Sequence, residues 1–148
     1  MSEIYDRLMA DMKAAMKEHD TVAVNAIRGV IAKAKDLTVN AGKDMTDEAV
    51  LAVLAKGAKQ REESIAQFTA AGRAELAAAE QKELDLLKKY LPAQLGEAEV
   101  AAVVQAVIAE TGAASKKDMG RVMKETMARL KGQADGKLVS RLVGAALP

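Results

Sequence analysis

The stretch Leu91-Pro92-Ala93-Gln94-Leu95-Gly96 interrupts a chain of 148 residues that otherwise has a helical pattern. Pro92 pushes the residue before it out of helical geometry, and Gly96 favours a turn close behind. We therefore predict a domain boundary at this stretch. It separates an N-terminal long-helix domain, residues 1–92, from a C-terminal three-helix domain, residues 97–148.

Four helices are predicted before the boundary, because apolar residues recur there at the spacing of one helix face. They cover residues 2–18, a segment from a cap at Asp20 to about Gly42, a segment from a cap at Thr46 or Asp47 to Gly72, and residues 73–90. The residues expected on the buried faces are Ile4, Leu8, Met12 and Met16; Val24, Ile27, Ile31 and Ala34; Leu51, Leu54, Ala58, Ile65 and Phe68; and Leu76, Leu84, Leu87 and Leu91.

Three shorter helices are predicted after the boundary. The first covers residues 97–111 and is closed by Gly112. The second begins at Ser115-Lys116-Lys117-Asp118, a pattern close to a capping box, and ends before Lys131-Gly132. The third runs from Asp135 to the end. The expected core face of the second helix consists of Met119, Val122, Met123, Thr126, Met127 and Leu130.

Composition indicates an all-α fold. Alanine supplies 31 residues, whereas the aromatic residues are Tyr5, Phe68 and Tyr90 alone. Alanine favours helices, and strands favour β-branched and aromatic residues. The absence of cysteine excludes disulfides and thiolate metal sites, and a single histidine does not build a zinc site. We therefore expect no metal and no cofactor.

The chain has no sequence signal for a membrane. Its longest apolar run, residues 49–55, is far shorter than the roughly 18 residues that mark a membrane span. The N-terminus MSEIYDRLMADM carries acidic residues early and lacks the apolar core of a signal peptide. These features predict a cytoplasmic location.

Positive charge gathers at the C-terminal end. Residues 112–148 carry 8 basic and 3 acidic side chains, whereas residues 1–111 carry 14 basic and 18 acidic ones. Such an asymmetry indicates either an anionic partner or ordinary surface variation. Clustered lysine and arginine side chains are suited to bind phosphate oxygens, whatever the base sequence. The candidate nucleic-acid contacts are Lys117, Arg121, Lys124, Lys131, Lys137 and Arg141.

Helical geometry places the basic row of Lys117, Arg121 and Lys124 opposite the expected core face, and Lys131 continues it if the helix extends one residue further. The nearby acids Asp118 and Glu125 are expected on another flank, where they do not neutralise this row. Arg141, Lys137 and Gly144 are expected together on the exposed side of the last helix.

Gly120 lies between the basic row and the apolar face. A glycine inside an exposed helix costs about 1 kcal/mol relative to alanine. Its missing side chain suits the close approach either of a neighbouring helix or of a nucleic-acid backbone. Gly132 and Gly136 suit tight turns or the same close approach.

Six strings between residues 59 and 136 resemble the YqeY proteins, and the likeness as a whole covers essentially the entire chain. They are KQREESIAQF at 59–68, GR at 72–73, the helix at 80–87, YLPAQL at 90–95, SKKDMGRVM at 115–123 and KGQADG at 131–136. The resemblance implies a two-part helical fold. Its C-terminal part is similar to the tail domain of the B subunit of the glutamine-dependent tRNA amidotransferase, which contacts tRNA. Gln133 stands where the family pattern has lysine or arginine, a departure that removes one charge from the basic surface.

Three functions stay open at this point. The first is a tRNA-binding or tRNA-associated helical module, with tRNA and amidotransferase or other translation-related proteins as partners. The second is a carbon–nitrogen ligase component that uses glutamine as amido donor, although no catalytic residues, nucleophile or ATP site can be identified in the sequence. The third is a protein-interaction adaptor with no role in RNA binding.

The predicted boundary can be tested by limited proteolysis. We expect the first cuts between Pro92 and Gly96, because few contacts cross a domain boundary. The two fragments should each keep a helical circular dichroism spectrum, with the smaller one marginally stable because of its size. First cuts within residues 20–90 would show that the boundary is misplaced.

Overall fold

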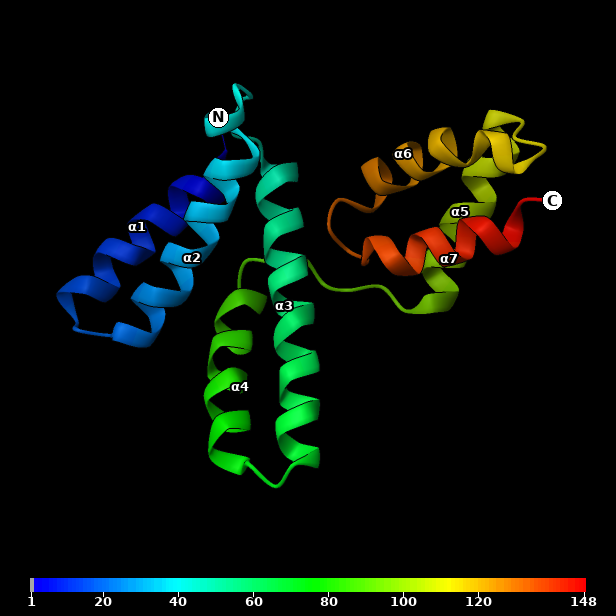
Figure 1. The fold of residues 1–148 in the computed structure, drawn as a ribbon. Helices are drawn as coiled ribbons and strands as arrows, with labels where there is room; N and C mark the ends of the chain where they lie inside the picture. Colours follow the sequence, from blue (N-terminus) through cyan, green and yellow to red (C-terminus); the bar gives the residue numbers. More distant parts are fainter. Residues whose placement is uncertain (1) are drawn as a thin grey trace. The chain divides into compact units, whose positions relative to one another are not determined.

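The computed structural model describes residues 2–148, and Met1 of the predicted N-terminal domain lies outside them. Over these residues the chain forms helices and no strand, which confirms the all-α prediction (Figure 1). The elements are α1 (Glu3–Lys17), α2 (Thr21–Leu37), η1 (Val39–Ala41), α3 (Asp47–Ala70), α4 (Ala74–Lys88), α5 (Glu97–Thr111), η2 (Lys116–Asp118), α6 (Met119–Leu130) and α7 (Gly136–Ala146).

The first three helices each have a short polar residue at the N-cap position. The hydroxyl of Ser2 accepts from the Tyr5 N–H at 3.0 Å, and Asp20 accepts from the Ala23 N–H at 3.1 Å. Thr46 caps α3 in the same way. Each cap satisfies a backbone donor that the first helical turn leaves unpaired. The predicted starts of α2 and α3 follow from this chemistry.

The chain divides into two compact units, residues 1–91 and residues 92–148. In the first unit, α1 packs against α2, and α3 pairs with α4 across a turn at Gly72, whose φ is +72° (Figure 1). Leu8, Ile27, Leu54 and Leu87 are fully buried in its core. Burial of each such side chain contributes about 1.5–3 kcal/mol. Independent folding of the two units stays a prediction.

Two residues predicted to be buried lie at the surface. Met16 is 50% exposed and Leu76 is 43% exposed. Met16 lies in the last turn of α1, and Leu76 lies in the first turn of α4 beside the Gly72 turn. Periodicity assigned them to apolar faces correctly, but the ends of helical hairpins have fewer neighbouring helices to cover such faces.

The second unit packs α5, α6 and α7 against one another. Val100, Val104 and Val107 of α5 are buried at the spacing of one helix face, and Val139 and Val143 of α7 meet the same core. The predicted core face of α6 is confirmed for Val122, Thr126 and Leu130, which are buried, while its three methionines are partly buried.

The second unit differs from the sequence prediction at the start of α6, whereas the predicted end of this helix is confirmed. The residues Lys116–Asp118 form the 3₁₀ segment η2 instead of the first turn of an α-helix. At the other end, Lys131 has a φ of +46°, so the helix stops at Leu130. A left-handed backbone cannot continue a right-handed helix.

Thr126 is a buried polar residue in this second core. Its side chain is fully buried, and its hydroxyl has no hydrogen-bond partner among the described residues. A buried hydroxyl without a partner lowers stability by about 1–3 kcal/mol.

We therefore expect Thr126→Val to raise the free energy of unfolding by about 1–3 kcal/mol, since valine keeps the shape and removes the hydroxyl. Urea denaturation monitored by circular dichroism measures the change. Thr126→Ala is the control, because it also removes a methyl group and should be less stable than the valine variant. A valine variant less stable than the native protein would contradict this account of the core.

Candidate nucleic-acid interface

All eight candidate contact residues lie in the second unit, and all six candidate cations are exposed. Lys117 lies in η2, while Gly120, Arg121 and Lys124 lie on the exposed side of α6. Lys131 and Gly132 form the turn after α6, and Lys137 and Arg141 are one turn apart on α7. Because α6 ends at Leu130, the one-residue extension that would let Lys131 continue the basic row does not occur.

The arginines of this unit are engaged by carboxylates. Arg121 Nη2 lies 3.1 Å from Asp118 Oδ1, and Arg141 Nη2 lies 2.7 Å from Glu97 Oε1. The prediction that Asp118 lies too far round the helix to neutralise the row is wrong. Asp118 lies three residues before Arg121, at the junction of η2 and α6, and this spacing brings the two side chains together.

Arg129 is also paired, although it was not among the predicted contacts. It bridges Glu110 of α5 and Glu125 of its own helix, the latter with 3.3 Å between Nε and Oε1. The hydrogen bond from Arg129 holds the pKa of Glu110 below its usual value. These pairs are solvent-exposed, and water screens them so that they contribute little to stability.

The lysines of this unit, unlike its arginines, do not pair with carboxylates of residues 2–148. Each is exposed, and within residues 2–148 their ammonium groups make no ion pair or hydrogen bond. We call these residues the lysine set: Lys116, Lys117, Lys124, Lys131 and Lys137. Lys116 was not among the predicted contacts, because it lies outside the basic row of Lys117, Arg121 and Lys124.

Gly120 has open space in front of it. A Cβ atom built at this position would meet no other side chain or neighbouring backbone within 4 Å among the described residues. Close packing against another helix therefore does not explain this glycine. Gly144 is the opposite case, since its Cβ would lie 3.8 Å from Met119 Cε of α6. Gly144 thus faces α6 and does not share an exposed side with Lys137 and Arg141, contrary to the prediction.

Gly132 and Gln133 hold the turn after α6 against the segment that precedes α5. The φ of Gly132 is +80°, a conformation that glycine adopts readily. Its carbonyl accepts from Gln94 Nε2 at 2.9 Å, and the carbonyl of Gln133 accepts from the Leu95 N–H at 2.8 Å. The described contacts give Gly132 a role in the turn.

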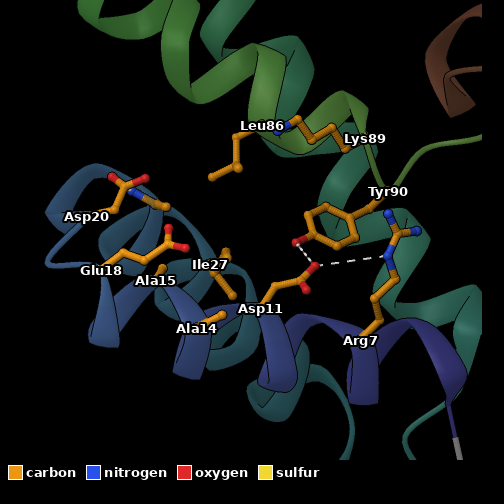
Figure 2. A pocket seen from close by; sticks show the side chains of 11 residues that line it. Arg7, Asp11, Ala14, Ala15, Glu18, Asp20, Ile27, Leu86, Lys89 and Tyr90 are labelled. Carbon is orange, nitrogen blue, oxygen red and sulfur yellow. Dashed lines mark hydrogen bonds and ion pairs between the residues drawn. The ribbon is translucent and has the colours of Figure 1, made fainter.

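A separate pocket of about 290 Å³ lies in the first unit, between α1, the start of α2 and the end of α4 (Figure 2). At one end of it, Tyr90 donates a hydrogen bond to Asp11 at 2.6 Å, and the guanidinium of Arg7 lies 4.8 Å from the centre of the Tyr90 ring. Burial, helped by this hydrogen bond, raises the pKa of Tyr90 far above its usual value. The shift moves the pKa of the phenol further from the neutral range that suits a general base.

Within the described residues, no three histidine, aspartate or glutamate side chains are arranged to hold a metal ion. None of the helices in residues 2–148 combines the length and apolar character that a membrane span needs.

Comparison with known proteins gives a consistent set of matches. The sequence model of the YqeY family, described as "Yqey-like protein", matches residues 5–147. The chain is 33% identical over 144 residues to Altered inheritance of mitochondria protein 41, mitochondrial, of Pyrenophora tritici-repentis, a match that covers 95% of this chain and 78% of the relative. The proteins of the same name from Lachancea thermotolerans and Saccharomyces cerevisiae (strain YJM789) are 34% and 35% identical. These matches cover 70% and 57% of this chain, and 57% and 46% of the relatives.

The names of these relatives contradict the cytoplasmic location predicted from the sequence, and that prediction is wrong. It rested on the short apolar runs of the chain and on the lack of a secretory signal. Neither feature distinguishes a mitochondrial protein from a cytosolic one.

The open space at Gly120 predicts that Gly120→Ala does not lower stability. We expect the free energy of unfolding to rise by up to about 1 kcal/mol, because alanine favours the helix. Gly57→Ala is the control. A Cβ at Gly57 would lie 3.3 Å from Leu87 Cδ1, so crowding should offset the helical gain. Thermal melts of both variants measure the difference, and a less stable Gly120→Ala protein would show that the glycine is needed for packing.

Proposed function

The chain belongs to the YqeY family, and from this premise we propose that its C-terminal unit binds tRNA by contacting phosphate groups. Two of the strings that resemble this family, SKKDMGRVM at 115–123 and KGQADG at 131–136, carry three of the five lysines of the lysine set. Lys116 and Lys117 lie in η2 and Lys131 follows α6, and all three are exposed to solvent. The proposed role is that of a binding module.

The lysine set carries this proposal. An ammonium group that already pairs with a carboxylate has to exchange that partner for a phosphate, whereas the ammonium groups of this set have no such partner within residues 2–148. Lysine acts as a point charge toward phosphate oxygens and needs no fixed orientation. Binding would release counterions from the nucleic acid, which favours association at low salt.

Arg121 and Arg141 take a secondary part in the proposed contact. Their carboxylate partners are exposed, and exposed pairs are weak enough for a phosphate to displace them. Gly120 leaves room beside Lys124, one helical turn away, for a sugar–phosphate backbone to approach α6 closely. Gly132 supports the surface indirectly, since its contacts hold the turn that presents Lys131.

The test is a charge reversal at three members of the lysine set, Lys117, Lys124 and Lys131, each changed to Glu. We expect tRNA affinity in fluorescence anisotropy at fixed moderate salt to fall roughly 100-fold, from about 1 kcal/mol per lost contact. The fold should survive, because substitutions at exposed positions usually change stability by within about 0.5 kcal/mol each.

The matched control changes the exposed lysines Lys13, Lys33 and Lys82 of the first unit to Glu. It alters the net charge of the protein equally and should leave affinity within a few-fold of the native value. Native protein that binds no tRNA would refute the proposed function and favour the protein-interaction adaptor. Equal losses in both triple variants would refute the proposed interface, because binding would then not depend on the lysine set.

A further inference from the structure

The second unit lacks the side chains that stack on nucleic-acid bases. Residues 92–148 contain no tyrosine, phenylalanine or tryptophan. Proteins that bind single strands stack successive bases on aromatic rings, and sequence-specific recognition of RNA loops uses the same contacts. A surface without such rings has to gain its affinity from the sugar–phosphate backbone.

The charged groups of this unit also favour the backbone over the bases. Arginine reads a guanine edge through two parallel hydrogen bonds. Here Arg121, Arg129 and Arg141 direct their guanidinium groups to carboxylates. The ammonium ions of the lysine set can meet a ligand without first leaving a carboxylate of residues 2–148, and such groups fix position on a nucleic acid but carry little sequence information.

Four of the five lysines of the lysine set lie along α6 or next to its ends. Lys116 and Lys117 precede the first residue of α6, Lys124 lies in its middle, and Lys131 follows its last residue. The 12 residues of α6 extend over about 18 Å at about 1.5 Å per residue. The backbone positions of these charges are therefore fixed by helical structure before any ligand binds.

Charges held at fixed backbone positions distinguish between flexible and rigid phosphate backbones. A single strand must be ordered to meet these charges, at a cost in conformational entropy that base stacking would not offset here. A double helix already holds its phosphates in place, and its charge density is about twice that of one strand. We propose that this surface binds the double-helical arms of folded RNA through their backbone, without regard to base sequence. This inference depends on the proposed tRNA-binding function and names the part of the RNA that is bound.

The experiment measures binding of the full-length protein by fluorescence anisotropy at one moderate salt concentration. The probes are tRNA, two RNA duplexes of unrelated sequence and about 16 base pairs, a length that known duplex-binding domains span, and an unstructured single strand of twice that length. The single strand carries the same number of phosphates as a duplex and so controls for total charge.

We expect both duplexes to bind equally, within a factor of two, and at least about 10-fold more tightly than the single strand, a difference of about 1.4 kcal/mol. The variant with Lys117, Lys124 and Lys131 changed to Glu should lose the duplex preference. Equal or tighter binding of the single strand, or a strong preference for one duplex sequence, would overturn this inference while tRNA binding stands. Failure of every probe, tRNA included, would overturn the proposed function as well.

Discussion

Close contact between helices through small side chains is the constraint on which this fold depends. Only three aromatic residues are available to fill a core. The helices must therefore approach closely, and the buried residues of α2 include Ala23, Ala26 and Ala34. Between α3 and α4 the contact is close enough that a Cβ at Gly57 would lie 3.3 Å from Leu87 Cδ1. Interiors packed this densely respond to the addition or loss of a single methylene group.

The charged side chains lie on the surface around these cores, where the arginines and the lysines have different roles. Arg61 joins α3 to α4 through Glu83, with 3.2 Å between Nε and Oε2. In the second unit Arg129 and Arg141 join α6 and α7 to α5 in the same manner. The planar guanidinium group suits such bridges because it offers several donors in a fixed geometry. The lysines of the second unit take no part in these bridges and are left to face solvent.

Sequence patterns predicted the helices well because the signals for their ends are local. A cap such as Asp20 needs only the N–H three residues later, and Gly112 ends α5 through its own positive φ. The exposure of Met16 and Leu76 could not be predicted, since burial depends on which helices lie next to each hairpin end.

The candidate interface was predictable in its residues but not in their partners. Periodicity placed Arg121 and Lys124 on the exposed side of α6, as observed. It could not show that η2 brings Asp118 to Arg121, or that Arg141 meets Glu97 from a helix 44 positions away in the chain. It also gave no signal for the pocket near Tyr90, whose contact with Asp11 spans 79 positions. Contacts between distant segments depend on tertiary packing, which helical periodicity does not describe.

The salt dependence of tRNA binding by the native protein tests the central claim most directly, because it counts the phosphates that the lysine set neutralises. Contacts from four or five lysines to a double-helical backbone should give a log–log slope of affinity against salt concentration between about −3 and −5. A slope flatter than about −1 would contradict the account, since binding would then depend on few or no phosphate contacts.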